Sequence, residues 1–451
     1  MQDQTYSEPQ NLSSQGSGRA TAYAEHNKIV TLDGKTHVVW LDADKERFWV
    51  RGRTLDRDSG EWSAVTTMGP AEDNHGGPGL TVDSRGYLHI IYFPHHGPFR
   101  YRRSSRINDL SAWDEEICFG EGLSYPMMIC AADDTLIVTA RRGYYDADGK
   151  DLEGNRMEQE LWKKPRGGDW KRVSTILRSR HPGYAHFAAS MSWGKDHRTI
   201  HLNCRIYETN PDSTGNPITA VGYLTSPDEG ETWTHADGTG VTLPATADTV
   251  DLLIKNDEGC GPDLSSGPLA VGPDGTPHLI YTVNDKDTSR LYLATPAGES
   301  GWEKFDLTSF LPATVKGWGT NLAMGGGMTF DATGRATILT AAFKLNASGR
   351  LAREEWGHPS TEIVRLWSDD DLKTFAGEVL SPIDEEEAHW LANLERPTGH
   401  HPVPQSPGVI YTAGGPGGGL VDLDMKNRVV WCPLPTRDWI GAITDVRTTL
   451  S

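Results

Sequence analysis

The sequence predicts an all-β protein folded as a seven-bladed β-propeller with four antiparallel strands per blade. Glycine (49 residues), proline (27) and tryptophan (15) are abundant, and two short sequence signals each recur seven times along the chain. Many turns and aromatic residues, without long helix-forming stretches, favour many short strands. The 451 residues are expected to form a single domain, with an N-terminal extension over about residues 1–20 and the seven blades over residues 21–451.

The first recurring signal is a tight turn between two short apolar runs. Its copies lie at residues 33–37, 83–89, 133–134, 196–201, 274–278 and 331–334, with a degraded copy at 407–408. A unit that recurs along the whole chain is typical of a repeat architecture. Each copy therefore predicts a hairpin between the two inner strands of one blade.

The second signal is an aromatic residue that follows a polar turn and opens a short strand. Its seven copies are Trp62, Trp113, Trp170, Trp233, Trp302, Phe375 and Trp431. Each interval between them contains one copy of the first signal, and Ser226 to Trp233 resembles the S-x-D-x-G-x-T-W turn, or Asp box, of sialidase-type propellers. Two signals that stay in phase predict four strands per unit and radial closure, which protects the strand edges.

The composition limits the partners. The 62 acidic residues outnumber the 43 basic ones and give a net charge of −19, which disfavours nucleic acid and anionic membranes. An anionic sugar polymer stays compatible with this charge if basic side chains gather in one cleft.

The five cysteines form no C-x-x-C pair and are expected to be buried structural thiols. No apolar run approaches the roughly 18 residues that a membrane span needs. The polar first 18 residues lack a signal-peptide core, so either the protein stays inside the cell or a leader has been removed.

A propeller also predicts where a site should lie. Side chains just before the first strand of each blade and just after the second should converge on one face, opposite the turns. These positions include His26, Asn74, His75, His95, His96, Tyr125, Arg141, Arg142, Tyr184, His186, Arg205 and Trp318. His, Tyr and Arg are enriched there in blades two to four. In contrast, His37, His89, His201 and His278 recur inside the strand repeat and are expected to pack or to form hydrogen bonds at the turns.

These residue types suit one reaction. Removal of the proton α to a uronate carboxylate requires neutralisation of that carboxylate, by Arg or protonated His. It also requires a base and an acid, which His and Tyr can supply. The cluster therefore predicts a metal-independent polysaccharide lyase that acts by β-elimination. A glycoside hydrolase would usually need two carboxylates that flank the glycosidic bond, and that alternative stays open because the mouth also contains Glu72, Asp73 and Asp263. Sugar binding without catalysis stays open as well.

Three segments resemble a known family. Asn74-His75-Gly76-Gly77-Pro78, His95-His96 and the run PFRYRRS over residues 98–104 resemble the ulvan lyases of polysaccharide lyase family 25, and family 24 is similar. The resemblance implies a seven-bladed enzyme that cleaves, endolytically, the bond between sulfated rhamnose and glucuronate or iduronate. The product would carry a 4,5-unsaturated uronate end.

The resemblance also implies roles for individual residues. His75 and His95 match the two active-site histidines of the family, Tyr125 its catalytic tyrosine, Arg141 its carboxylate-neutralising arginine and Tyr184 a further cleft tyrosine. Either Tyr125 or a histidine would be the base, depending on the uronate, and Tyr125 would protonate the leaving oxygen. We expect the remaining mouth residues to bind substrate; these are Asn74, His96, Arg142, Arg205, His26 and Trp318.

Further expectations follow from the resemblance. No cofactor is required for catalysis. A structural zinc, present in some relatives, would find ligands in His201, Cys204, Cys260 and His278, although their spacing is not typical of a metal site; a structural calcium is equally unsupported. The expected partner is sulfated ulvan, the expected state a monomer, and the expected location secreted or periplasmic. The alternatives are a rhamnose–glucuronate exo-lyase, an α-rhamnosidase that uses a histidine such as His26, and a non-catalytic sugar-binding propeller.

Overall fold

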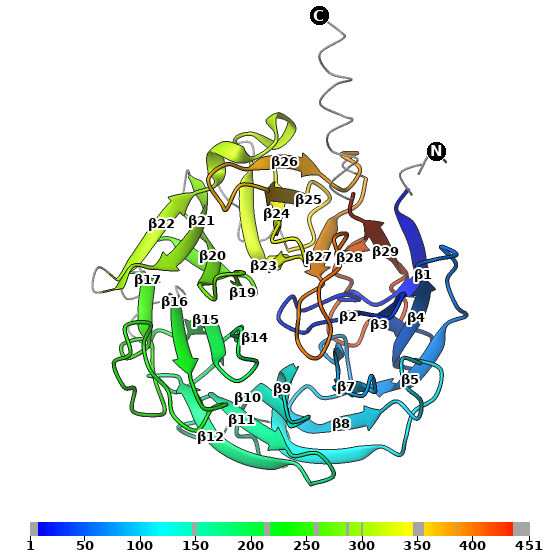
Figure 1. Cartoon of the computed structure of the whole chain (residues 1–451), viewed down its shortest axis with the longest axis horizontal. Helices are drawn as coiled ribbons and strands as arrows, with labels where there is room; N and C mark the ends of the chain where they lie inside the picture. The colour runs from blue at the N-terminus through cyan, green and yellow to red at the C-terminus, as the bar shows by residue number, and fades with distance from the viewer. Residues whose placement is uncertain are drawn as a thin grey trace, which may run out of the picture.

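The computed structural model describes residues 8–146, 150, 152–211, 217–256, 261–285, 288–298, 301–345, 356–384 and 386–435. This part of the chain is all-β, with two short 3₁₀ helices, η2 (Thr308–Phe310) and η3 (Ala313–Val315). The strands follow one another around a common centre, and β1 near the N-terminus lies beside β29 near the C-terminus (Figure 1). None of the helices in the described ranges is long and apolar enough to cross a membrane.

The strands form one large sheet and three smaller ones. The 12-stranded sheet has the order β26-β25-β24-β23-β27-β28-β29-β1-β3-β4-β5, with β2 on β3. Its members are β1 (Gln10–Gly16), β2 (Ile29–Leu32), β3 (Lys35–Ala43), β4 (Phe48–Asp56), β5 (Thr66–Ala71), β23 (Gly319–Phe330), β24 (Ala336–Phe343), β25 (Glu362–Ser368), β26 (Ala376–Val379), β27 (His389–Leu394), β28 (Gly408–Ala413) and β29 (Asn427–Pro433).

The 7-stranded sheet runs from β12 to β6 in sequential order. It contains β6 (Gly79–Val82), β7 (Leu88–Tyr92), β8 (Gly97–Arg103), β9 (Ile117–Cys130), β10 (Leu136–Arg142), β11 (Glu158–Lys164) and β12 (Lys171–Arg178). The two 5-stranded sheets contain β13 (Ala185–His186), β14 (Ser190–Trp193), β15 (Ile200–Glu208), β16 (Ile218–Ser226) and β17 (Asp251–Lys255), and β18 (Asp263–Ser266), β19 (Ala270–Val271), β20 (Pro277–Asn284), β21 (Ser289–Pro296) and β22 (Trp302–Asp306).

Burial explains which strands lie inside. Every residue of β7 and of β24 is buried, as expected for short apolar strands covered on both faces. β4 alternates buried and half-buried residues, as expected for a strand with one face toward solvent. The cores lie between neighbouring sheets: Leu41 and Val50 from β3 and β4 belong to one cluster with Leu80 and Ile90 from β6 and β7. Side chains of adjacent units thus stabilise each other.

The predicted turns are confirmed at six of their seven places. Asp33 and Gly34, with φ of 44° and 75°, join β2 to β3, and the corresponding turns join the antiparallel pairs β6/β7, β9/β10, β14/β15, β19/β20 and β23/β24. The seventh prediction, a tight turn at residues 407–408, was wrong, because the longer segment 395–407 connects β27 to β28. This segment crosses other units, since Cys130 N donates to Thr398 O and His400 N to Val82 O.

The second signal also has a clear local geometry. Asp228 Oδ1 accepts hydrogen bonds from Ser226 Oγ (2.9 Å) and Thr232 N (2.8 Å). Asp370 holds its turn in the same way, through Ser368 and Thr374. The aspartate thus replaces backbone partners inside the turn. Trp431 differs from the expectation, because it lies inside β29 and does not open it.

Two further expectations need adjustment. Residues 10–16, assigned to the N-terminal extension, form β1, which pairs with β29 and contacts β3 at Gly16 and Asp42. Cys130, Cys204 and Cys432 are buried free thiols as predicted, but Cys118 is exposed, because it lies in the outward-facing first half of β9. Cys260 lies outside the described residues.

Candidate functional site

The predicted mouth residues come from strand ends that meet on one face. His75 lies in the segment before β6, His95 follows β7, Tyr125 lies within β9, and Arg141 is near the end of β10. The rings of His75 and His95 stack at 4.0 Å, His95 lies 6.2 Å from Tyr125, and Arg141 Cζ lies 4.6 Å from the Tyr125 ring centroid. The structure therefore brings these four side chains together, at the strand ends opposite the aspartate turns.

Asp73 connects the two histidines. Its Oδ1 lies 3.2 Å from His75 Nδ1 and its Oδ2 lies 2.8 Å from His95 Nδ1. Burial alone would raise the pKa of Asp73, but hydrogen bonds from both histidines outweigh it, so this pKa lies below its usual value. Because an ionised carboxylate only accepts hydrogen bonds, both imidazoles carry a proton on Nδ1.

Arg19 distinguishes the two histidines from each other. Its Nη1 contacts His75 Nε2 and Tyr23 OH. Since a guanidinium only donates, His75 Nε2 must accept, and His75 is neutral with both ring nitrogens engaged. Burial, with a smaller contribution from Arg19, lowers the pKa of His75 to about 4 against the opposing effect of Asp73. His95 Nε2 has no such donor in the part of the chain that the structure describes, so His95 has a ring nitrogen available for a proton.

Tyr125 marks the point where β9 changes partner. β9 pairs with β8 up to Leu123 and with β10 from Leu123 onward, and Tyr125 has a φ of 58°. A bulky residue at positive φ is strained, and such strain is common at functional sites. The bend turns the phenol into the cluster, where it meets Tyr23 edge-on at 4.9 Å and His186 at 4.7 Å. Burial, and then Tyr23, raises the pKa of Tyr125 well above its ordinary value, so the phenol keeps its proton at neutral pH.

Arg141 is a buried cation with unused donors. The residue is 1% exposed, and its Nη1 donates to Ala185 O at 3.3 Å. Its Nε and Nη2 have no hydrogen-bond acceptor among the described residues. These two N–H groups form one edge of the guanidinium fork, the edge that binds a carboxylate through two parallel bonds. A small hollow beside it is lined by Glu25, Tyr125, Arg141, Gln159, His186, Ala188 and Ala189.

Several other predicted residues surround this cluster. His96 stacks on His95 at 4.0 Å, and burial lowers its pKa to about 3. Tyr184 lies 5.3 Å from Arg141 Cζ and is 47% exposed, so it forms an outer wall. His26 is buried 6.2 Å from Tyr125. Asn74 is buried, and its Nδ2 donates to Gly419 O, so it holds a loop of the last unit beside the site.

Two predicted residues, Arg142 and Trp318, do not join the cluster, and Arg205 reaches Glu25 and His186 there only through its charge. Arg142 points to the opposite side of β10 from Arg141, because side chains alternate along a strand; it lies 5.0 Å from the Tyr144 ring. Arg205 pairs with Asp263 at 3.1 Å. Trp318 contacts Lys344 and packs against the core between β21 and β25. The in-strand histidines are buried as predicted, and three of them bond to polar side chains: His37 to Asn108, His89 to Tyr101 and His201 to Tyr223.

Three residues of the cluster were missed. Arg19, Tyr23 and Glu25 lie in the segment that precedes β2, where the repeat predicts only His26. Arg19 and Tyr23 could not be found from the repeat, because they follow β1, whose place in the fold depends on pairing with the distant β29. His186, in β13, was predicted at the mouth from the same positional signal as Tyr184, and it joins the cluster beside Tyr125.

Two groups of side chains in the described ranges could hold a metal ion. In each group three ligand atoms lie within 4.8 Å of one another: Asp73 with His75 and His95, and Cys130 with Asp134 and His400. In the first group both histidine Nδ1 atoms bond to Asp73, and in the second His400 Nε2 is engaged by Ala131 O. Neither group in the described ranges includes His201, Cys204 or His278, and Cys260 lies outside those ranges.

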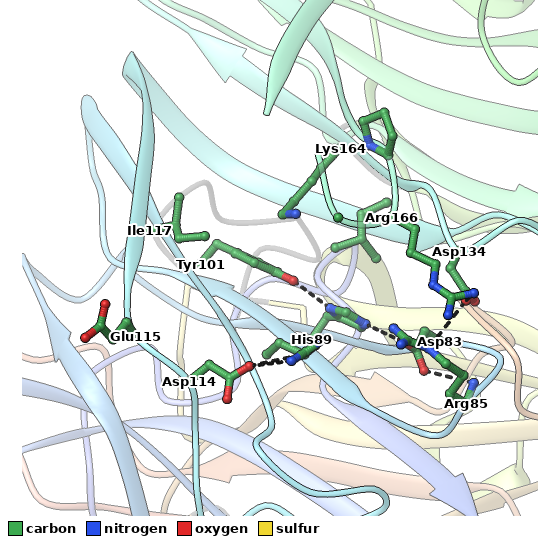
Figure 2. Close-up of a pocket in the computed structure, with 14 residues that line it drawn as sticks. Asp83, Arg85, His89, Tyr101, Asp114, Glu115, Ile117, Asp134, Lys164 and Arg166 are labelled. Carbon is green, nitrogen blue, oxygen red and sulfur yellow. Dashed lines mark hydrogen bonds and ion pairs between the residues drawn. The ribbon is translucent and has the colours of Figure 1, made fainter. Parts of the chain in front are cut away.

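A second hollow lies at the other end of the strands. Figure 2 shows it between the turns that follow β6, β9 and β11, with basic and acidic side chains around it. Its cations are engaged by neighbours: Arg85 pairs with Asp83, Arg103 with Asp114, and Lys164 Nζ donates to Gly168 O. This internal pairing differs from Arg141, whose fork is open, and it makes the first cluster the stronger candidate site.

Comparison with known proteins agrees with this description. The family model for BNR repeat-containing family members matches residues 35–310. The chain belongs to the BNR repeat-containing family. The matched region of this BNR repeat protein starts with β3 and includes His75, His95, Tyr125 and Arg141.

The relatives of this BNR repeat protein include ulvan lyases. "Ulvan Lyase-PL25" of Pseudoalteromonas sp. (strain PLSV) is 25% identical over 125 residues, which is 22% of this chain and a quarter (25%) of the relative's length. A solved family 25 ulvan lyase bound to -[GlcA(1-4)Rha3S]- superposes with a TM-score of 0.67 at 15% identity, over 94% of this chain and 95% of that one. The structure of polysaccharide lyase Uly1 superposes with a TM-score of 0.59 at 13% identity, over 94% of this chain and 97% of that one. The BNR repeat protein shares its fold with these enzymes.

Proposed function

We propose that this protein is a polysaccharide lyase that cleaves ulvan by β-elimination between sulfated rhamnose and glucuronate or iduronate. The observation that carries the proposal is the buried fork of Arg141 beside Tyr125 and the stacked His75–His95 pair. The sugar repeat to which the solved relative is bound, -[GlcA(1-4)Rha3S]-, supports the same substrate class. The proposed chemistry uses side chains of this chain and requires no cofactor.

The proposed reaction begins at the carboxylate of the uronate. Arg141 Nε and Nη2 would bind it through two parallel hydrogen bonds, which lowers the energy of the enolate-like intermediate. His95 Nε2 would take the proton from C5, with Nδ1–H fixed by Asp73. The electron pair of the C5–H bond then forms the C4=C5 double bond as the C4–O bond breaks.

Tyr125 is the proposed acid. Its phenol keeps its proton at neutral pH, and it would donate that proton to the leaving rhamnose oxygen. His75 would act by position, because its two ring nitrogens are held by Asp73 and Arg19. Tyr184 and His96, at the rim of the cluster, would contact the neighbouring sugars.

We also propose that the ring consists of seven blades of four strands. The grouping would be β2–β5, β6 to the first half of β9, the second half of β9 to β12, β14–β17, β19–β22, β23–β26, and β27–β29 with β1. Pairing of β1 with β29 supports a last blade made from both ends of the chain, which would close the ring. The polymeric substrate implies that the enzyme works outside the cytoplasm, and we propose that it acts as a monomer.

Incubation with purified ulvan tests the function directly. A lyase produces unsaturated uronate ends that absorb in the ultraviolet, and fragments whose masses add up to the intact chain without water. New reducing ends without that absorbance would mean hydrolysis, as for an α-rhamnosidase or another glycosidase. Release of only terminal units would mean an exo-lyase, and binding without products a lectin. The last three outcomes each contradict the endolytic elimination proposed here.

A further inference from the structure

The hollow beside Arg141 contains a carboxyl group that the elimination proposed above does not use. Glu25 lines this hollow together with Arg141, Tyr125 and His186. Its side chain is only 10% exposed, and its Oε1 is buried without a hydrogen-bond partner in the described part of the chain. A buried polar atom with no partner is rare, and where it faces a site it suggests a missing ligand.

The backbone around Glu25 is held firmly. Lys28 is fully buried, and its Nζ donates to the carbonyl oxygens of Tyr23 (3.0 Å) and His26 (2.9 Å). Arg396 Nη2 donates to the carbonyl oxygens of Ala24 and Glu25, both at 2.9 Å. All four carbonyls of residues 23–26 are thus fixed by two buried cations, which orient the Glu25 side chain toward the hollow.

Among the described residues, no lysine or arginine forms an ion pair with the Glu25 carboxyl. Lys28 uses its ammonium group on the backbone, and Arg396 uses Nη2 on the backbone and Nη1 on Ser190 Oγ. His186 Nε2 lies 3.8 Å from Glu25 Oε1. Burial lowers the pKa of His186 well below its ordinary value, so His186 is neutral and supplies no charge. Burial also raises the pKa of Glu25, against smaller opposing effects of its own backbone N–H, Lys28 and Arg396.

We propose that Glu25 is a neutral carboxylic acid that donates a hydrogen bond to the uronate carboxylate, opposite the Arg141 fork. This inference rests on the proposed function, because it assigns a second binding group to the same carboxylate. A neutral acid is a good partner for an enolate-like dianion, since it donates a short hydrogen bond and adds no negative charge. No proton leaves Glu25 during the reaction: the O–H bond stays with Glu25 while the charge on the substrate oxygen grows.

A neutral Glu25 makes substrate binding depend on pH. Once Glu25 loses its proton, two carboxylates face each other in a buried hollow, which costs binding energy. The charged and titratable groups around Glu25 are Arg141, His186, Tyr125, Lys28, Arg396 and Arg205. Because burial raises the pKa of Tyr125 well above its ordinary value, Glu25 would be the first donor of the hollow to become a repulsive anion as the pH rises. Ionisation of Glu25 should therefore set the alkaline limb of kcat/KM.

The test compares Glu25→Gln with Glu25→Ala in the full-length protein, by ulvan turnover followed in the ultraviolet over a pH series. Glutamine keeps an N–H donor and cannot ionise, so we expect kcat/KM within about threefold of wild type near neutral pH and an alkaline limb displaced to higher pH. Alanine removes the donor, and we expect a loss of about 100-fold or more, the scale of one oxyanion-binding donor. If Glu25→Ala unfolds, Glu25→Met, of similar length but without a donor, replaces it.

Glu395 supplies a matched control. It is also fully buried, and burial raises its pKa as well, but it accepts a hydrogen bond from Gly408 N at the start of β28, away from the cluster. Glu395→Gln should leave the pH profile of turnover unchanged. Equal inactivity of Glu25→Gln and Glu25→Ala, or an alkaline limb unmoved in Glu25→Gln, would overturn the proposal.

An infrared readout separates this inference from the proposed function. A protonated carboxyl gives a carbonyl band distinct from that of a carboxylate, and one such band should vanish in Glu25→Gln at neutral pH. If wild-type protein yields no unsaturated ends, the proposed function fails, yet the band still reports whether Glu25 is neutral. If wild type is active and the Glu25 band is absent, the inference alone fails.

Discussion

Replacement of Arg141 by alanine should remove activity without loss of stability. The guanidinium is buried, makes one backbone hydrogen bond of 3.3 Å, and has two open donors. Loss of one oxyanion-binding donor typically costs about 3–4 kcal/mol, a factor of about 10²–10³ in kcat. Because Arg141→Ala removes two donors and a charge, we expect kcat to fall by about 10³ or more. Arg141→Lys keeps the charge but loses the fork and should lose about 10–100-fold.

The stability of the same variant should change little. Removal of the side chain loses about 1 kcal/mol for the hydrogen bond and some packing against Tyr125 and Tyr184. It also removes a buried charge, whose effective desolvation cost is several kcal/mol. The two effects oppose each other, so Tm should stay close to the wild-type value or rise.

Arg365 is the matched control for this variant. It is equally buried, in β25, but its Nη1 pairs with Glu378 at 2.9 Å. Arg365→Ala should therefore lower Tm while the activity of the folded fraction stays normal. Turnover of ulvan in the ultraviolet and thermal unfolding by circular dichroism measure both quantities. If Arg141→Ala retained activity within tenfold of wild type, or lost it only through unfolding, the assignment of the carboxylate fork would be refuted.

Three further predictions follow from the same structure. Tyr125→Phe removes the proposed acid and should reduce turnover about 10³-fold at unchanged Tm; near-normal turnover would contradict its role. Asp228→Ala removes the acceptor of three hydrogen bonds, from Ser226 Oγ, Thr232 N and Thr232 Oγ1, and should lower the free energy of unfolding by about 1–2 kcal/mol in urea titrations, with normal activity; an unchanged midpoint would show that these bonds do not stabilise the turn. Acidification should destabilise the fold, because burial lowers the pKa of His75 and of His401 to about 4. The unfolded chain takes up these protons below about pH 6.5 and the folded chain only near pH 4. Each histidine therefore lowers the free energy of unfolding by up to about 3 kcal/mol as the pH falls through that window; equal urea midpoints at pH 7 and pH 5 would disprove this.

Most of the strand order could be predicted from the sequence, because turn chemistry is local. Asp33-Gly34 and Asp228 hold their turns with atoms a few residues away, so the pattern contains the interaction itself. The sequence was misleading where the chain pairs over long distances. The strand β1 depends on β29, more than 400 residues further along, and the connection at 395–407 depends on contacts with other units.

The candidate site divides in the same way. His75, His95, Tyr125 and Arg141 are among the mouth positions that the repeat predicts, since strand ends of one type must meet on one face, and the family resemblance singled them out. The sequence by itself determined the all-β class, the aspartate turns and these four positions, because each follows from a local or periodic rule. Only the tertiary structure decided their states: Asp73 and Arg19 hold His75 neutral, and the Arg141 fork stays open beside Glu25. Burial and contacts between distant segments set proton positions, and no spacing in the sequence encodes them.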